Sequence, residues 1–546
     1  MVVAKKPRIV IIGAGMAGLA AANRLYAHAG SANLFELSIV EGSDRIGGRI
    51  YSSEFGGDRV EVGATWIHGI GGSPVYNIAQ QAQALHSEIP WERMDGYPDK
   101  EITITEDGST ADPSLLSSIS MLYRGLMDFA GERKIFNDTG VDHKIRIAEM
   151  AAERCRSNGF SKNGVSIGSF LRCGLDLYWS SMDTEAQKDL RKIEEDVFAM
   201  HENTERTYTS ADDLTELDFE AESEYREFPD EEITIAKGYS TVVHSLASIL
   251  PSGCIQLGRK VEKVVWTKDP TELAKDSHYP VSVWCSDGSV ILADHVIVTV
   301  SLGVLKAETV TNSAGMFSPP LPLFKKEAIS KLGFGVVNKL FLQLEPSLSV
   351  DDGEGFPCLQ MVFDQKKLRE KQNHDCGIPW WIKKTVSFCP IHKNSNVVLS
   401  WFAGKEALEM ESLSDDEIID GVSTTLSCLT LNSHKQCLKE NERQLGKLRN
   451  AKIAKLLRSR WGTDPLFRGS YSYVAVGSSG EDMDLLAEPL PKMPRDNYVP
   501  SGSPLQLLFA GEATHRTHYS TTHGAYFSGI REASRLLQHY GWAGAP

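Results

Sequence analysis

The feature that most constrains the fold is a glycine-rich turn near the N-terminus, set between a strand and a helix. Residues 8–12 (RIVII) form a β-branched apolar run, and residues 13–18 (GAGMAG) lead from it into an alanine-rich helix. A second predicted strand over 37–40 ends at Glu41, 23 residues after the last glycine of the turn. Strand, G-x-G-x-x-G, helix, strand and acid in this order are typical of a dinucleotide-binding βαβ unit. The sequence therefore predicts a doubly wound α/β domain.

Each part of this motif has a physical role. Gly13 permits the tight turn, Gly15 lets the backbone approach a pyrophosphate, and Gly18 lets the helix pack on the sheet. The helix N-terminus offers unpaired N–H groups and a positive dipole end to the phosphates. Glu41 is expected to bind the adenosine ribose hydroxyls, and its charge would repel the 2′-phosphate of NADP. FAD and NAD remain as candidate cofactors.

Composition narrows the class of protein. The 546 residues are 41% hydrophobic and 24% charged, as in ordinary globular proteins. The formal net charge of -15 disfavours nucleic acid as a partner and favours a cationic substrate. No uncharged apolar stretch reaches the ~20 residues of a membrane span, so we expect no membrane partner, leader or anchor.

The number and spacing of the cysteines indicate the redox state of the compartment. There are nine, an odd number, and no Cys-x-x-Cys pair occurs. This pattern predicts neither a disulfide framework nor a metal site, and it favours a reducing compartment. We expect a cytoplasmic protein.

The rest of the chain alternates helical and strand-rich regions. Helices are predicted over 118–130, 183–200 and 524–537 from apolar residues near 3.6 spacing. Strands are predicted from β-branched and aromatic runs at 261–266, 281–285, 296–300, 339–344, 397–402 and 507–512.

Two charged stretches stand apart from this pattern. Residues 212–232 hold eleven carboxylates and one base, and residues 435–460 hold nine bases and two acids. The acidic stretch is interpreted as a solvated face or loop, with a cation-attracting rim as the alternative. The basic stretch is interpreted as an exposed helix or an insertion, with a basic tether as the alternative.

Several further segments together resemble the flavin-dependent amine oxidases, and among them the plant polyamine oxidases. The resemblance extends from residue 8 to about 535, and it rests on residues 41–49 (EGSDRIGGR), 63–69 (GATWIHG), 298–306 (VTVSLGVLK), 333–339 (GFGVVNK), 509–514 (FAGEAT) and 522–529. It implies a Rossmann-like FAD-binding domain and a mixed-sheet α+β substrate-binding domain. The first is expected to comprise residues 1–85, 233–310 and 460–546, and the second residues 86–232 and 311–459.

The resemblance implies non-covalent FAD and assigns residues to it. Arg49 is expected to bind the pyrophosphate, Glu512 the ribityl chain, and the main chain of Thr522 the flavin pyrimidine at a helix N-terminus. Ser470 occupies the place of the cysteine that bonds to flavin in monoamine oxidases. Further cofactor-binding residues are expected at Gly63, Ala64, Thr65, Trp66, Val261 and Trp461. For Val261 and Trp461, a place in the core would look the same in the sequence.

The resemblance also implies a catalytic lysine and a substrate site. Lys339 is expected to hold a water near flavin N5 and to manage protons, because a buried lysine readily shifts its pKa. The alternative is a strand lysine that faces solvent. His68 is expected to act on the substrate amine, or else to be a packed histidine. Tyr471 is expected to contact the cationic substrate with its ring, and Thr521 stands where many amine oxidases carry a second ring.

The implied activity is oxidation of a secondary amine of thermospermine or spermine by hydride transfer to FAD. Back-conversion would give spermidine, 3-aminopropanal and hydrogen peroxide, with oxygen or another acceptor reoxidising the flavin. The alternatives are a methyl-lysine demethylase, a monoamine or amino-acid oxidase, and a non-catalytic flavoprotein. The preferred polyamine, the oligomeric state and the carboxylates of the substrate site stay open, with Glu202 and the acids of 212–224 as candidates for the last.

Overall fold

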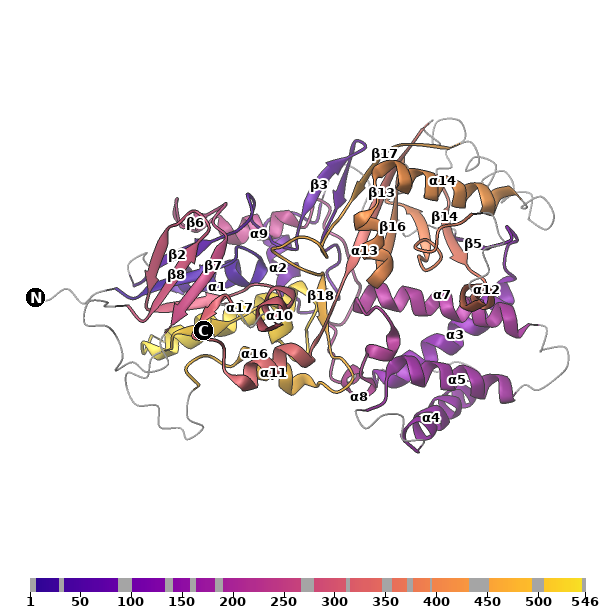
Figure 1. The fold of residues 1–546 in the computed structure, drawn as a ribbon, viewed down its shortest axis with the longest axis horizontal. Coiled ribbons are helices and arrows are strands. Elements are labelled where there is room, and N and C mark those ends of the chain that lie inside the picture. Colours follow the sequence, from indigo (N-terminus) through magenta and orange to yellow (C-terminus); the bar gives the residue numbers. More distant parts are fainter. Residues whose placement is uncertain are drawn as a thin grey trace, which may run out of the picture.

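The structure is a computed structural model, and it describes residues 6–28, 34–86, 101–132, 141–157, 164–181, 190–266, 279–310, 315–345, 356–370, 377–392, 395–431, 451–492 and 505–542. Two parts lie side by side (Figure 1). One part is built on a parallel sheet, and the other combines a mixed sheet with a group of helices.

The parallel sheet has five strands in the order β19-β10-β1-β2-β6. Its strands come from all three segments expected for the cofactor domain: β1 (Arg8–Ile12), β2 (Glu36–Val40), β6 (Ile255–Gln256), β10 (His295–Val298) and β19 (Leu507–Phe509). The boundaries of the two domains stay predictions.

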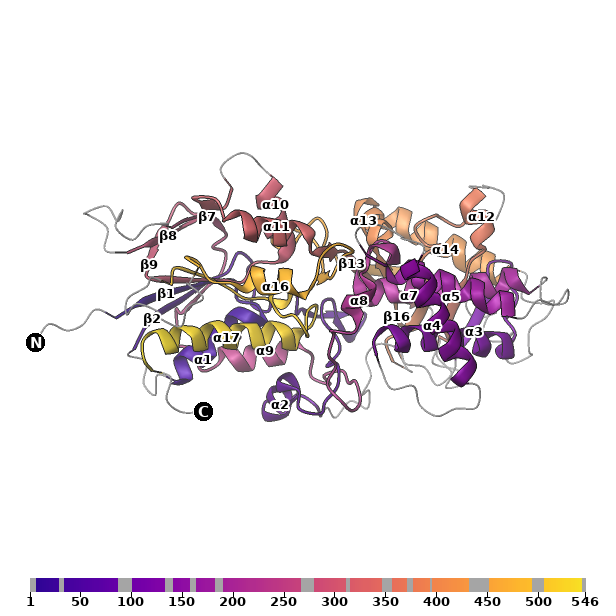
Figure 2. The ribbon, with the colours of Figure 1, turned by 90° about the horizontal axis from the view of Figure 1, so that it is seen from below.

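Both faces of this sheet are covered, as the continuous apolar runs of its strands require. Ile9 and Ile11 face α1 (Met16–His28) and α17 (Thr522–His539), whereas Val10 and Ile12 face a second sheet. That second sheet has the order β11-β7-β8-β9 and lies on the opposite side of β1 and β2 from α1, α9 (Ser240–Ala247) and α17 (Figure 2). Its strands are β7 (Val261–Trp266), β8 (Val281–Cys285), β9 (Val290–Ala293) and β11 (Phe317–Ser318).

Helices α1 and α17 pack closely because small residues meet where they cross. A Cβ atom on Gly529 of α17 would lie 2.2 Å from the carbonyl oxygen of Ala17 in α1. The first helix after the nucleotide motif and the last helix of the described chain therefore form one layer.

The mixed sheet has six strands in the order β17-β13-β16-β15-β14-β5. Neighbours are antiparallel except β14 and β5, which are parallel. The strands are β5 (Glu101–Thr105), β13 (Val337–Glu345), β14 (Cys358–Val362), β15 (Ser387–Pro390), β16 (Val397–Ala403) and β17 (Lys452–Arg458).

Side chains alternate between the two faces of this sheet. One face carries residues such as Leu340, Leu359 and Phe402 and forms a core with α13 (Gly404–Ser412) and α14 (Asp415–Leu431). The other face carries Lys339 and Trp401 and borders a cavity. A separate core joins the helices α3 (Pro113–Ala130), α4 (Val141–Ser157), α5 (Ile167–Ser181) and α7 (Arg191–Thr209).

Most predicted elements are confirmed. The strands at 261–266, 281–285, 296–300, 339–344 and 397–402 appear as β7, β8, β10, β13 and β16, and the helices at 118–130 and 524–537 as α3 and α17. The predicted helix at 183–200 is α7, which begins at Arg191, and residues 182–189 lie outside the described chain.

The exposed helix predicted within 435–460 is wrong for the part of this stretch that the structure describes. Residues 452–458 form β17, an edge strand paired with β13, and residues 432–450 lie outside the described chain. Charged residues are common on edge strands because they discourage pairing with other chains. The lysines and arginines of residues 452–458 therefore belong to the edge strand of the mixed sheet.

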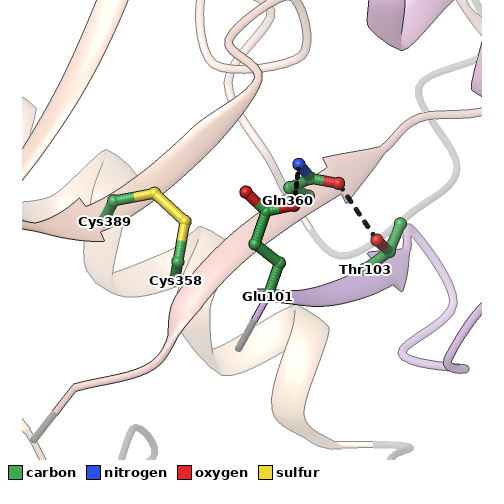
Figure 3. The surroundings of a disulfide bond; sticks show 5 residues. All are labelled: Glu101, Thr103, Cys358, Gln360 and Cys389. Carbon is green, nitrogen blue, oxygen red and sulfur yellow. Dashed lines mark hydrogen bonds between the residues drawn. A yellow bond between two sulfur atoms is a disulfide. The ribbon is translucent and has the colours of Figure 1, made fainter. Parts of the chain in front are cut away.

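The expectation about disulfides also needs correction. Cys358 and Cys389 form a disulfide, with their Cα atoms 4.1 Å apart (Figure 3). Antiparallel pairing of β14 with β15 sets the two cysteines opposite each other although they are 31 residues apart. Sequence spacing does not reveal such a cross-strand pair.

Among the residues that the structure describes, no helix is long and apolar enough to cross a membrane. The same residues contain no group of three or more histidine, cysteine, aspartate or glutamate side chains arranged to hold a metal ion.

Candidate active site

A cavity of about 1020 Å³ connects the parallel sheet with the mixed sheet. Its wall includes every residue that the sequence assigned to cofactor, substrate or catalysis, apart from Gly18. Gly18 lies beneath the turn instead, where a Cβ atom would stand 2.0 Å from the carbonyl oxygen of Gly13. The residues chosen from separated segments are thus close together in space, whereas their individual roles stay predictions.

The glycine turn suits a close approach by a dinucleotide. Gly13 has a φ of 106°, which favours glycine, and Gly15 pairs with Gly47 at the cavity wall. Gly13, Gly15, Met16 and Ala17 border the cavity where α1 begins, so the N-terminal end of this helix, which carries unpaired N–H groups, lies at the cavity wall. This cradle fits the pyrophosphate of FAD.

Glu41 is held at the end of β2. Its carboxylate accepts from the backbone N–H of Ala14 at 2.7 Å and of Ser43 at 2.8 Å. Each carboxylate oxygen can accept a second bond, and Glu41 borders the cavity next to Val261, which begins β7. The expected contact with a ribose is compatible with this position.

Arg49 and Glu512 form an ion pair between separated segments. Arg49 Nη1 lies 2.9 Å from Glu512 Oε1 and donates to the Ser470 carbonyl at 2.8 Å. The other Glu512 oxygen accepts from Ser472 Oγ at 2.5 Å and from the Ser520 N–H at 2.9 Å. Glu512 therefore fixes the chain around the cavity, in addition to the ribityl contact expected of it.

Lys339 is buried, which excludes the alternative of a strand lysine in solvent. It is 2% exposed, and its Nζ donates to the carbonyls of Glu61 at 2.7 Å and Gly63 at 3.0 Å and to Thr65 Oγ1. The ammonium also lies 4.2 Å from the centre of the Trp401 ring. These three acceptors match the three donors of an ammonium group. The water expected beside Lys339 stays a prediction.

His68 faces the cavity and forms a pair that the sequence analysis missed. Its Nδ1 lies 2.8 Å from Glu232 Oε1, and both side chains are partly exposed. The hydrogen bond from His68 lowers the pKa of Glu232. Because an ionised carboxylate only accepts, Nδ1 is the donor to Glu232. In the neutral form of the ring, Nε2 is then the acceptor. Glu232 belongs to the acidic stretch 212–232, which was its only signal in the sequence.

Tyr471 and Thr521 differ in how they meet the cavity. The ring of Tyr471 borders it while the hydroxyl donates to the Thr207 carbonyl, and burial raises the pKa of this phenol. Thr521 caps α17: its Oγ1 accepts from the Gly524 N–H at 3.0 Å and donates to the His518 carbonyl at 2.7 Å. The need for a helix cap gives a physical reason for a threonine where related enzymes carry a ring.

Two further residues support the flavin end of the cavity. Trp461 is nearly buried and packs edge-on against Phe467, with ring centres 5.1 Å apart. Ser470 Oγ exchanges hydrogen bonds of 2.8 Å with the backbone of Val337. Trp461 thus serves the core and the cavity wall together.

The end of the cavity away from the glycine turn is acidic and aromatic. Its carboxylates and rings are Glu101, Glu205, Asp218, Glu222, Glu227, Glu232, Trp66, Tyr208, Tyr225, Trp401, Tyr471, Tyr473 and Tyr519. Such a wall suits an elongated cation, which carboxylates and aromatic faces both attract. The acidic stretch therefore contributes a rim that attracts cations, the alternative interpretation of its sequence.

Several acids named as candidates lie elsewhere. Glu202 is bonded to Arg172, and burial raises the pKa of its carboxyl. Asp212 pairs with Lys405 at 2.7 Å, and Asp213 caps a short 3-10 helix. None of these three carboxylates borders the cavity.

Comparisons with known proteins agree with this geometry. Residues 16–537 match the family described as flavin containing amine oxidoreductase. The chain is 53% identical to probable polyamine oxidase 5 of Arabidopsis thaliana, over 98% of this chain and 99% of that protein. It is 46% identical to polyamine oxidase 1 of Oryza sativa subsp. japonica, over 98% of both, and 34% identical to the human peroxisomal N(1)-acetyl-spermine/spermidine oxidase, over 97% of this chain and 95% of that protein.

Solved structures with the same fold are more distant in sequence. Cyclohexylamine oxidase from Brevibacterium oxydans matches with a TM-score of 0.61 at 15% identity, over 98% of this chain and 100% of that chain. A redesigned putrescine oxidase matches with a TM-score of 0.58 at 16% identity, over 98% and 99%. At this identity the likeness concerns the fold.

Proposed function

Because the chain belongs to the family of flavin-containing amine oxidoreductases, we propose that its substrate is a polyamine. One observation carries the proposal: a single cavity joins the glycine-lined cleft to a wall of carboxylates and aromatic rings. A chain with several ammonium groups complements such a wall. The polyamine oxidases among its relatives, aligned over nearly their whole length, support the same substrate class.

FAD is the cofactor of this enzyme, and when bound it accepts a hydride from the carbon next to the reacting amine. Gly13, Gly15 and the start of α1 would hold its pyrophosphate together with Arg49, and Glu41 would hold the adenosine ribose. Ser470 offers no thiol, which supports non-covalent binding.

The chain's own residues prepare the substrate for this step. The reacting amine must be neutral, because an ammonium has no lone pair to assist the departing hydride. We propose that His68 takes that proton, because Glu232 orients the ring and Nε2 of the neutral ring is an acceptor. The other amines stay charged and are held by the carboxylates and by the ring of Tyr471. Lys339 holds the loop from Glu61 to Thr65 against the cavity.

We propose thermospermine or spermine as the substrate, with cleavage of a 3-aminopropyl unit. Hydrolysis of the resulting imine gives spermidine and 3-aminopropanal, and reoxidation by oxygen gives hydrogen peroxide. Another electron acceptor would give no peroxide, so an oxygen electrode with and without catalase distinguishes the two. We also propose a cytoplasmic location, which imaging of a fluorescent fusion would test.

The test is the visible spectrum of the purified protein, recorded without oxygen before and after addition of spermine or thermospermine. Bleaching of the flavin band, with spermidine as the amine product, is the expected result. A band that persists with both tetraamines would refute the polyamine substrate. Monoamines and methylated lysine peptides would then be assayed in the same way.

A further inference from the structure

The sheet face that borders the cavity carries a row of side chains leading away from Lys339. Lys339 is paired with Trp401 on β16, and Gln360 on β14 is paired both with Ser387 on β15 and with Thr103 on β5. All but Thr103 border the cavity. The row crosses the sheet from β13 to its edge strand β5, so the sheet forms a floor that extends away from Lys339.

Glu101 stands at the far end of this floor. It begins β5, lies beside Cys358 of β14 in the parallel register, and borders the cavity. Its Oε2 accepts from Gln360 Nε2 at 2.6 Å, and Gln360 Oε1 accepts from Thr103 Oγ1 at 3.1 Å (Figure 3). The amide is oriented by the threonine and in turn orients the carboxylate.

Among the residues placed by the structure, Glu101 has a polar support and no cationic partner. No lysine, arginine or histidine of the described chain forms an ion pair with it, although many other acids have such partners. Residue 101 is exposed to solvent and borders the cavity, so a cationic group arriving through the cavity can reach the carboxylate and supply the opposite charge.

The disulfide strengthens the strand that supports Glu101. Cys358 and Cys389 cross-link β14 to β15 directly beside Glu101, two residues from Gln360 (Figure 3). The amide that positions the carboxylate therefore lies on a strand that is covalently fixed to its neighbour.

The distance across the floor selects for length. Four strand intervals separate β13 from β5 in the order β13-β16-β15-β14-β5, which corresponds to ~19 Å at the usual strand spacing. This is a distance between backbones, and the Glu101 side chain leans toward β14, where it accepts from Gln360. A substrate that reacts near Lys339 therefore meets this carboxylate with the end of an extended aliphatic chain that is shorter than the backbone distance.

We infer that Glu101 binds the terminal ammonium group farthest from the reacting carbon and thereby selects long polyamines. This inference rests on the proposed polyamine oxidase activity. Glu101 is a specificity-determining residue in this scheme and takes no part in the chemical step. Gln360 acts through it as a positioning residue.

The test compares two substrates in Glu101→Gln, which removes the charge and keeps the shape. One substrate is spermine, and the other is a spermine analogue with an intact 3-aminopropyl end and a methyl group in place of the opposite terminal amine. For spermine, kcat/KM is expected to fall about tenfold, through KM, because one charge-assisted contact is lost. For the analogue, kcat/KM is expected to stay as in the wild type. Glu101→Ala is expected to give the same pattern, and melting temperature and flavin content check the folding of both variants.

Glu345→Gln is the matched control, since it removes one negative charge from the same sheet outside the cavity wall. This variant is expected to leave kcat/KM unchanged for both substrates. An equal loss for spermine and the analogue in the Glu101 variants, or no loss for spermine, would overturn the role of Glu101 while turnover by the wild type upholds the proposed function. Absence of turnover of both compounds by the wild type would overturn the proposed function and this inference together.

Discussion

Replacing Lys339 by methionine removes an ammonium group whose three hydrogen-bond donors are all in use. The acceptors, the carbonyls of Glu61 and Gly63 and the hydroxyl of Thr65, lie in a buried region and would each lose a partner. At about 1 kcal/mol for each buried acceptor, the free energy of unfolding would fall by about 3 kcal/mol. Methionine fills about the same volume as the lysine stem, so the loss reports the ammonium group, including its contact with the Trp401 ring, rather than a cavity.

The assay follows thermal unfolding of Lys339→Met by circular dichroism, together with steady-state turnover of spermine. A loss of this size is expected to lower the melting temperature by about 3–5 °C, because the entropy of unfolding grows with chain length. Turnover is expected to fall as well, because the loop from Glu61 to Thr65 borders the cavity and loses its tie to β13. Lys455→Met, the same change on the exposed strand β17, is expected to alter neither quantity.

Two results would refute this reasoning. A melting temperature equal to that of the wild type would mean that the ammonium of Lys339 does not hold the loop. A lowered melting temperature with unchanged turnover would leave Lys339 with a structural role and would contradict the catalytic role predicted from the sequence.

Three other changes give separate outcomes. Glu41→Gln turns an amide N–H toward a backbone N–H, so FAD binding, measured by flavin fluorescence, is expected to weaken about tenfold to a hundredfold. Glu36→Gln, at the exposed start of β2, is the control and is expected to leave FAD binding unchanged. Lys325, fully buried, donates to carbonyls at the C-terminal end of α16 (Gly480–Ala487), and burial lowers its pKa to about 7. The unfolded chain binds that proton more tightly than the folded chain does. The free energy of unfolding, compared with that of Lys325→Met, should therefore rise by about 1.4 kcal/mol per pH unit between pH 7 and 10 in denaturant titrations. A difference that does not change with pH would contradict the lowered pKa. Cys358→Ser is expected to cost about 3 kcal/mol of stability, and peptide mapping of the unreduced protein should find the bond to Cys389; a free thiol there would contradict it.

The parts of the site that sequence predicted are those fixed by local geometry. The glycine turn and Glu41 belong to one βαβ unit, in which strand, turn and helix follow one another directly. Each of these residues is recognisable because its role depends on neighbours within about thirty positions of the chain. Lys339 and Tyr471 required the resemblance to a family, because nothing in their immediate surroundings distinguishes them from core residues of a strand.

The parts that sequence missed depend on register between distant strands. Glu101, Gln360 and the disulfide meet only because β5 pairs with β14 and β14 with β15. Glu232 was visible only as one of eleven acids, and its contact with His68 joins residues 164 positions apart. Which acid of a charged stretch faces a cavity is decided by tertiary packing, and composition carries no record of it.

The strand order of the parallel sheet has a consequence for how the enzyme is made. Its centre, β1, pairs with β10, and β10 pairs with β19, so the sheet joins residues 8–12 to residues 507–509. On the ribosome the glycine turn is synthesised before β10, β19 and α17, so its sheet and the helix that packs on α1 are completed only when those later segments emerge. Contacts of such long range slow folding and leave apolar strands exposed in the nascent chain. The cleft that the glycine turn lines is therefore complete only after residues 507–539 have been synthesised.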